Sequence, residues 1–282
     1  MTGKIIDGKA TALAVREKVA EDVAEMVAAG KPKPGLATVL VGEDPASQVY
    51  VRSKIKACEK AGIESFGHKL PETATQEEVE GLVKELNADP QVNGILVQLP
   101  LPDGLDEEKV LQAINLEKDV DGFHPVNIGR LAQKGRESLF VPCTPAGIMY
   151  LLGETGVQLE GAEAVVLGRS NIVGMPVALL LVKSNATVTI CHSRTRDLPG
   201  LVAQADILVG AVGKPEFIKA DWVKAGAVVV DAGYHPGGVG DVELAALVDK
   251  VSAYTPVPGG VGPMTINTLI MQSVQSGEKS LG

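Results

Sequence analysis

Apolar residues in the first half of the chain alternate between helical spacing and short buried runs. Between residues 9 and 29 the apolar positions recur at helical spacing, and Gly30, Pro32 and Pro34 end that pattern. A Thr75-x-x-Glu78 capping box marks the start of another helix. We expect strands at 36–41, 63–70 and 94–99 and helices at 9–29, 47–60, 75–88 and 106–114. Strands that alternate with helices predict a parallel sheet.

The second half of the chain repeats this alternation. We expect strands at 164–167, 187–191, 207–209 and 227–230 and helices at 145–155, 173–184 and 198–204. A final helix, about 264–276, follows a loop rich in Pro and Gly, and we expect it to pack on the first domain. The second half therefore predicts a parallel sheet of its own, of the Rossmann type.

The segment 115–144 has little periodicity and contains many Gly, Pro, Asp and Asn residues. We interpret it as the linker between two domains and as one wall of a cleft. The expected fold is an α/β protein with an N-terminal α/β domain over 1–140 and a Rossmann-type domain over 141–263. The helix that we assign to 264–282 returns to the first domain. A length of 282 residues suits this division.

Composition narrows the classes of protein that fit. Residues are 45% hydrophobic but only 3% aromatic, so Val, Ala, Leu and Ile must fill the core, as is typical of parallel sheets. A net charge of -9 and a pI of about 5.1 argue against nucleic-acid binding. Neither a signal peptide nor a long apolar run is seen, so we expect a cytoplasmic protein without membrane contact.

The three cysteines, Cys58, Cys143 and Cys191, form no C-x-x-C pair. Their odd number and wide spacing indicate neither a disulfide framework nor a thiolate zinc site. We expect buried, reduced thiols and no bound metal.

A loop at Gly168 has the features of a dinucleotide site. Gly168 follows the predicted strand directly, and Gly174 lies where the next helix begins. Glycines at such a turn let the backbone approach a pyrophosphate, and the start of the helix offers free N–H groups. The spacing departs from G-x-G-x-x-G because Ser170 takes the middle position, so an ordinary strand-to-helix turn is an alternative.

The next predicted strand favours NADP over NAD. NAD enzymes usually place an acidic residue about 20 positions after the glycines, but Cys191 is followed instead by His192-Ser193-Arg194-Thr195-Arg196. Guanidinium and hydroxyl groups suit a 2′-phosphate, although both arginines could be solvated loop charges. The cofactor residues expected here are Gly168, Arg169, Ser170, Val173, Gly174, Ser193, Arg194 and Thr195.

Candidate catalytic residues lie in the first domain. Tyr50 and Lys54 are four positions apart and share one face of a predicted helix. A shielded Lys can act as an acid or a base, and a Tyr ring offers a stacking surface. Gln98 ends the third strand, and Asp121 lies in an Asp-Val-Asp-Gly turn. Each residue alone fits a structural role, and a surface Tyr–Lys pair is the ordinary alternative.

Six motifs, in this order, resemble the bifunctional methylenetetrahydrofolate dehydrogenase/cyclohydrolase family over nearly the whole chain. They are 45–58 (PASQVYVRSKIKAC), 94–102 (GILVQLPLP), 118–124 (KDVDGFH), 142–145 (PCTP), the Gly168 loop (GRSNIVGMP) and 255–265 (TPVPGGVGPMT). One stretch, 231–238 (DAGYHPGG), departs from the family pattern. An aromatic residue, Tyr234, stands there where an aliphatic one is expected, beside the predicted nicotinamide site.

The resemblance implies NADP-dependent oxidation of 5,10-methylenetetrahydrofolate and hydrolysis of the methenyl product to 10-formyltetrahydrofolate. Residues 1–140 would form the folate-binding catalytic domain and 141–263 the NADP-binding domain. Lys54, oriented by Gln98, would move protons, Asp121 would bind the pterin, and Tyr50 would stack on it. The further contacts implied are Gly259, Gly260 and Pro263 for substrate and Tyr234 for cofactor. A homodimer acting in one-carbon metabolism and purine biosynthesis is expected.

Two other classes of function stay open from sequence alone. Another NADP-dependent dehydrogenase of similar architecture, of the amino-acid or shikimate type, would not need the Pro-Gly-Gly-Val-Gly-Pro loop. A non-catalytic nucleotide-binding module could keep the Gly168 loop, but it would have no reason to keep Tyr50, Lys54, Gln98 and Asp121.

Overall fold

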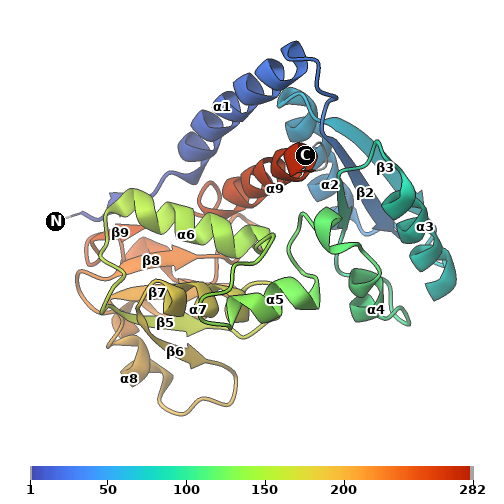
Figure 1. Ribbon diagram of the computed structural model, residues 1–282. Helices are drawn as coiled ribbons and strands as arrows, with labels where there is room; N and C mark the ends of the chain where they lie inside the picture. The colour runs from blue at the N-terminus through green and yellow to red at the C-terminus, as the bar shows by residue number, and fades with distance from the viewer. Residues whose placement is uncertain (1, 280–282) are drawn as a thin grey trace. The chain divides into compact units, whose positions relative to one another are not determined.

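The computed structural model describes residues 2–279 and divides the chain into two compact units (Figure 1). The six-strand unit consists of the residues up to Leu13 together with 131–135 and 142–265. The three-strand unit consists of 14–130, 136–141 and the residues from Ile266 onward.

The six-strand unit contains one parallel sheet, in the order β1-β9-β8-β7-β5-β6. Its strands are β1 (Lys4–Ile5), β5 (Glu163–Leu167), β6 (Thr187–Cys191), β7 (Ile207–Gly210), β8 (Val228–Asp231) and β9 (Ala253–Tyr254). Its helices are α6 (Cys143–Thr155), α7 (Gly174–Lys183), α8 (Leu198–Val202) and the short 3-10 turns η2 (Ala220–Trp222) and η3 (Leu244–Ala246). Chain order reverses at β5, since β6 lies on one side of it and β7 on the other.

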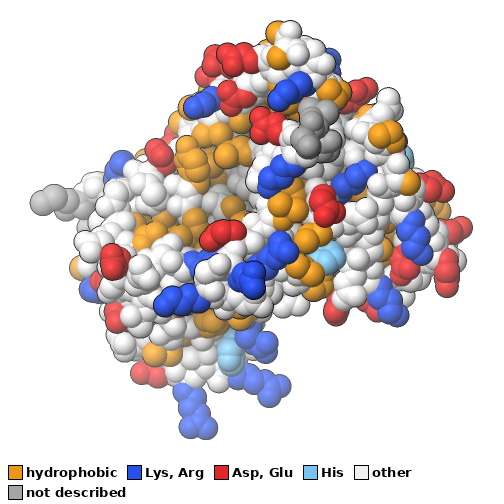
Figure 2. Space-filling view, in the orientation of Figure 1, with side chains coloured by type: hydrophobic (Ala, Val, Ile, Leu, Met, Phe, Trp, Pro, Cys, Tyr) orange, Lys and Arg blue, Asp and Glu red, His pale blue; other side chains and the backbone are white. Residues whose placement is uncertain are grey.

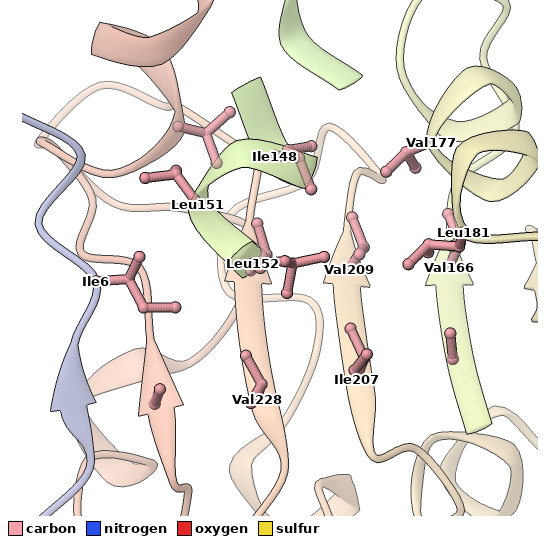
Figure 3. Packing of buried hydrophobic residues seen from close by; sticks show 14 of the residues in the cluster. Ile6, Ile148, Leu151, Leu152, Val166, Val177, Leu181, Ile207, Val209 and Val228 are labelled. Atoms are coloured by element: carbon pink, nitrogen blue, oxygen red, sulfur yellow. The ribbon is translucent and has the colours of Figure 1, made fainter. Parts of the chain in front are cut away.

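Helices cover both faces of this sheet. Side chains from α6 and α7 pack on one face, where Ile148 and Leu152 meet strand residues such as Val209 (Figure 3). The other face packs against α8 and the two 3-10 turns. Both faces of the central strands are buried, which explains their continuous apolar sequences.

The three-strand unit contains a parallel sheet in the order β3-β2-β4. Its strands are β2 (Gly35–Val41), β3 (Glu64–Leu70) and β4 (Gly94–Val97). Its helices are α2 (Pro45–Lys60), α3 (Gln76–Ala88), α4 (Glu107–Gln112), the 3-10 turn η1 (Leu116–Lys118) and α5 (Pro125–Leu131). One sheet face packs on α3 and α4, while α2 contacts β2 and β3. The predicted Thr75–Glu78 capping box is present.

Two long helices contribute to both units. Helix α1 (Gly8–Ala28) and helix α9 (Val261–Lys279) each cross from one unit to the other within their length. The Gln272 amide of α9 donates to the carbonyls of Val120 and Val141, at 2.8 and 2.9 Å. The Ser276 hydroxyl lies 2.7 Å from the carbonyls of Asn93 and Glu117. The prediction that the last helix packs back on the N-terminal fold is confirmed; positions 280–282 of the predicted helix lie outside the described residues.

The segment 115–144, which we interpreted as the linker between two domains, contains short elements that were not predicted. It contains η1 and α5, and the buried Asn127 of α5 donates from its side chain to Asp119 at 2.7 Å. The strands β1 and β9 were also missed. These elements are two to seven residues long, too short to carry a visible periodicity. None of the helices within 2–279 is long and apolar enough to span a membrane.

Candidate active site

The start of α2 sets the position of Tyr50 and Lys54. Asp44 caps the helix by accepting a 2.7 Å hydrogen bond from the backbone N–H of Ser47, and Pro45 occupies the first turn. Tyr50 and Lys54 then fall one turn apart on the same face. Lys54 is only 6% exposed, whereas Tyr50 is 41% exposed. The ammonium of a buried lysine therefore lies beneath a ring that remains open to a ligand.

Lys54 is held by two neighbours. Its Nζ donates to Oε1 of Gln98 at 3.1 Å and lies 5.7 Å from the centre of the Tyr50 ring. The other end of the Gln98 amide donates to the carbonyl of Leu99 at 2.6 Å. This second bond fixes the orientation of the amide, so that its oxygen faces Lys54. The sequence-based hypothesis that Gln98 orients Lys54 thus has a geometric basis.

A cysteine, Cys58, lies one turn beyond Lys54 on the same helix. Cys58 is completely buried, and burial raises the pKa of its thiol to about 12 even though the Lys54 charge opposes this shift. The thiol therefore stays protonated and unreactive near neutral pH. The chemistry available at this end of the sheet is proton transfer by Lys54 rather than attack by a thiolate.

Asp121 lies in the turn that follows η1, beside a second carboxyl. Asp119 is buried and accepts hydrogen bonds from the backbone N–H groups of Phe123 and His124 and from the Asn127 amide. Burial outweighs these bonds and raises the pKa of Asp119 to about 7, and the charge of Asp121 adds to the rise. Within 2–279, the half-buried Asp121 carboxylate has no hydrogen-bond partner. Asp119 thus shapes the turn and leaves Asp121 available to a ligand.

The Gly168 turn of the six-strand unit requires its glycines. Gly168 has φ +116°, and a Cβ there would lie 1.9 Å from the carbonyl oxygen of Ala211. A Cβ on Gly174 would lie 2.2 Å from the Gly168 oxygen. The Ser170 hydroxyl accepts from the N–H groups of Val173 and Gly174 at 3.2 and 3.3 Å, capping the start of α7. The serine in place of the middle glycine therefore holds the backbone at the start of α7.

A pocket of about 310 Å³ adjoins this turn at the carboxyl ends of β5, β6 and β7. Its lining residues are Leu167, Arg169, Ser170, His192, Ser193, Leu198, Val212, Lys214 and Phe217. Lys and Arg side chains project from the region of the loop after β6 (Figure 2), a loop that carries Arg194 and Arg196. Across the described chain, the guanidinium groups of Arg169, Arg194 and Arg196 have no acidic partner. Unpaired cations around a glycine turn fit a phosphorylated dinucleotide.

Sequence reasoning missed several residues of this pocket, notably Lys214 and Phe217. The place of Lys214 just after β7 is a signal that could have found it, because ligand groups collect at the carboxyl ends of strands where the chain order reverses.

Other predicted cofactor residues differ in their surroundings. The Thr195 hydroxyl accepts from the His192 N–H at 2.9 Å and so shapes the turn after β6. Val173 packs on the apolar core beneath α7. Ser193 and Arg194 are exposed, and Tyr234, just after β8, is 68% exposed.

The predicted substrate contacts Gly259, Gly260 and Pro263 belong to the six-strand unit, whereas Tyr50, Lys54, Gln98 and Asp121 belong to the other. The Gly259 carbonyl accepts from the Lys9 N–H at 2.9 Å, and a Cβ on Gly260 would lie 2.7 Å from the Thr255 side chain. This loop therefore depends on small residues. The structure brings Tyr50, Lys54 and Gln98 into direct contact, and it brings the glycine turn into one pocket with Ser193.

Between residues 2 and 279, no three His, Cys, Asp or Glu side chains are grouped as a metal site would require. The cysteines Cys58, Cys143 and Cys191 are buried and form no disulfide among the described residues.

Two protein-family models match the chain. Residues 6–121 match the catalytic domain of tetrahydrofolate dehydrogenase/cyclohydrolase, and residues 142–281 match the NAD(P)-binding domain of the same family. These matches cover both groups of candidate residues described above.

Individual proteins agree with the family models. The Bifunctional protein FolD of Teredinibacter turnerae is 58% identical over 285 residues, covering 100% of both chains. The methylenetetrahydrofolate dehydrogenase-cyclohydrolase of Trypanosoma brucei, solved with NADP cofactor and inhibitor, is 39% identical with a TM-score of 0.95, covering 100% of this chain and 99% of that one. The enzyme from Campylobacter jejuni is 44% identical with a TM-score of 0.93, covering 98% and 99%. The chain therefore belongs to the tetrahydrofolate dehydrogenase/cyclohydrolase family.

Proposed function

We propose that the chain oxidises 5,10-methylenetetrahydrofolate with NADP and hydrolyses the methenyl product to 10-formyltetrahydrofolate, with Lys54 as the residue that moves protons. The observation that carries this proposal is the buried Lys54, whose Nζ lies 3.1 Å from Gln98 Oε1 beneath the accessible ring of Tyr50. We further propose that the three-strand unit binds folate and the six-strand unit binds NADP, with the functional domains spanning 1–140 and 141–263.

Hydrolysis is the step that needs a proton-transfer group. The methenyl carbon is cationic, so it is the atom that water attacks. Water attacks that carbon while the amine takes a proton from the water. The carbon–N5 bond then breaks, the formyl group stays on N10, and N5 receives a proton from Lys54. One proton is released to solvent overall.

The other residues of the folate site bind and orient the substrate. The carboxylate of Asp121 has no hydrogen-bond partner among the described residues. It would accept paired hydrogen bonds from the pterin amino and ring N–H groups. Tyr50 would stack on the folate ring, and Gln98 would keep the Lys54 nitrogen in place. Gly259, Gly260 and Pro263 would bring backbone and ring surface close to the substrate.

Bound NADP would supply the hydride acceptor for oxidation of the methylene carbon. No protein acid is obligatory for that transfer, and the chain acts by positioning. Gly168 and Gly174 would admit the pyrophosphate, with Arg169, Ser170 and Val173 around it. Ser193, Arg194 and Thr195 would bind the 2′-phosphate. The unpaired Arg194 and the two glycine positions that exclude a Cβ support this fit, as does NADP in the Trypanosoma brucei relative. Tyr234 would lie on the nicotinamide side.

The variant Lys54→Met tests the central role. It keeps the length of the side chain but removes the amine, so methenyltetrahydrofolate hydrolysis should fall by about 100-fold or more. NADP affinity, measured by calorimetry, should stay within about two-fold of the wild type, because the cofactor residues lie in the other unit. Arg52→Met on the same helix, whose side chain is exposed, is the matched control. Undiminished hydrolysis in Lys54→Met would remove Lys54 from the mechanism.

The two rival functions have weaker support. A shikimate-type dehydrogenase or a non-catalytic module would share the Gly168 turn but would not explain the Tyr50–Lys54–Gln98 arrangement. Following methenyltetrahydrofolate absorbance with and without NADP separates the proposed enzyme from both rivals, since only the proposed enzyme consumes it without cofactor.

We also propose a use for the product, a cellular compartment and an oligomeric state. The 10-formyl product suits one-carbon transfer such as purine biosynthesis. Buried thiols that form no disulfide within the described residues suit a reducing, cytoplasmic compartment. A homodimer is supported by β6, which ends the sheet order and leaves one edge of its backbone unpaired within the described chain.

A further inference from the structure

The stretch 231–238, which departs from the family pattern, forms a tight hairpin after β8. The N–H of His235 donates to the carbonyl of Val239 at 2.8 Å, and the N–H of Gly238 donates to the carbonyl of His235 at 3.0 Å. These bonds fix the backbone of His235. Its ring Nε2 lies 2.8 Å from Oδ1 of Asp241. A carboxylate can only accept, so Nε2 carries the hydrogen.

Asp241 is fully buried and binds the backbone of the segment that follows β7. Its carboxylate accepts from three successive backbone N–H groups: those of Val212 at 2.6 Å, Gly213 at 3.0 Å and Lys214 at 3.0 Å. Such a set of N–H groups around one anion fixes the path of the backbone. Among the described residues, His235 is the one side chain that donates to this carboxylate.

The segment held by Asp241 forms part of the cofactor pocket. Val212 and Lys214 line that pocket together with Arg169 and Ser193. The preceding residue, Ala211, lies against the glycine turn, since its carbonyl oxygen would be 1.9 Å from a Cβ at position 168. A shift of this segment would therefore change both the pocket wall and the space beside the pyrophosphate turn.

A second buried carboxyl makes the His235 bond more important. Asp231 accepts the backbone N–H of Asp241 at 2.9 Å, so the two acids are adjacent. Burial raises the pKa of Asp231 to about 6, and the charge of Asp241 adds to this shift. A donor from His235 offsets the repulsion between the two carboxylates.

We infer that His235 is a positioning residue for the dinucleotide, acting through Asp241 to hold Val212–Lys214 against the bound cofactor. This role rests on the proposed function, because it takes NADP as the occupant of the pocket. His235 touches neither substrate nor reacting atoms. His235 therefore affects the affinity for the cofactor and does not affect the proton transfer carried out by Lys54.

The variant His235→Ala tests this inference. The dissociation constant for NADP, measured by calorimetry, and the KM for NADP should both rise about five-fold, while kcat at saturating NADP stays within about two-fold. Methenyltetrahydrofolate hydrolysis, which needs no NADP, should be unchanged. His235→Gln, whose amide can reach Asp241 with an N–H, should restore most of the affinity.

A matched control separates positioning from general loss of stability. Lys224→Ala removes a lysine–carboxylate hydrogen bond to Asp206 in the same unit, away from the pocket residues. It should leave NADP affinity unchanged even where the melting temperature falls. Unaltered NADP affinity in His235→Ala overturns the inference, as does failure of His235→Gln to restore it. If the wild type bound NADP but lacked both folate reactions, the proposed function would fail, while the affinity comparison would still decide the role of His235.

Discussion

At the scale of single residues, local spacing identified the candidate pair but not its environment. Tyr50 and Lys54 share a helix face because they are four positions apart, which any helix imposes. Gln98 is 44 positions from Lys54 in sequence, and its 3.1 Å contact depends on how β4 packs beside α2. Burial of the Lys54 ammonium likewise follows from tertiary packing. Sequence alone therefore left the surface-pair alternative open, and the fold removes it.

Arg194 provides a residue-scale prediction about cofactor choice. Arg194→Ala removes a cation expected at the 2′-phosphate, worth about 1.5–3 kcal/mol for a charged hydrogen bond. The KM for NADP should rise about ten-fold or more, while the KM for NAD, which lacks that phosphate, should change little. Steady-state kinetics with both cofactors measure the ratio. Lys219→Ala, an exposed cation of the same unit, is the control, and equal effects on both cofactors would show that Arg194 is only a solvated loop charge.

At the scale of elements, periodicity predicted the helices and strands long enough to display it. Helices α2, α3 and α7 and strands β2, β5 and β6 lie within a few residues of their predicted limits. Helix α5 and strands β1 and β9 could not be predicted, because they are too short to display a period and contacts of the folded chain hold them in place. Strand β1 pairs with β9, about 250 positions away. Asp119 accepts the Asn127 amide of α5, a contact that only the folded turn creates.

The attachment of α5 through Asp119 predicts a pH dependence of stability. The folded pKa of Asp119, about 7, exceeds the value of about 3.9 for an unfolded Asp. The folded chain then keeps a proton that the unfolded chain loses. This contribution to the free energy of unfolding is fully present below about pH 4 and declines as the pH rises to about 7. Urea unfolding of the wild type should show the decline.

The variant Asp119→Asn isolates this contribution. It is destabilised at every pH because an amide replaces one acceptor oxygen, but the decline between about pH 5 and about pH 7 should shrink by up to about 2 kcal/mol. Asp206→Asn, an exposed carboxyl, serves as the control. An identical pH slope in the wild type and in Asp119→Asn would show that Asp119 is ionised throughout this range.

At the scale of the whole molecule, the two parallel sheets were predictable, but the path of the chain between units was not. The transitions near 13 and 265 lie inside α1 and α9, where helical periodicity continues without interruption. Nothing in a continuous amphipathic pattern reveals which unit each turn of the helix contacts. Similarly, an edge strand is defined only when the sheet order is known, so β6 could not be recognised as an edge.

The proposed homodimer leads to a prediction at β6. Ile190 on this strand is 36% exposed, and Val182 on the neighbouring α7 is 55% exposed. Ile190→Lys places a charge at an edge that a second copy would cover, so the dimer should dissociate into monomers. Light scattering after size-exclusion chromatography measures the mass. Thr187→Lys at the start of β6 is the milder control. If the Ile190→Lys variant kept the mass of a dimer at low protein concentration, the dimer interface would lie elsewhere.

The interleaved path of the chain has a consequence for its synthesis. Strand β1 is synthesised before β9, which is its only partner in the sheet of the described chain. The three-strand unit likewise lacks the contacts of Gln272 and Ser276 until that part of α9 has been synthesised. Neither unit is therefore complete while most of the chain is still emerging from the ribosome, although domains commonly fold one after another during translation. Both units would reach their final form almost together, once residues beyond 270 are free, and until then each would expose apolar surface to chaperones.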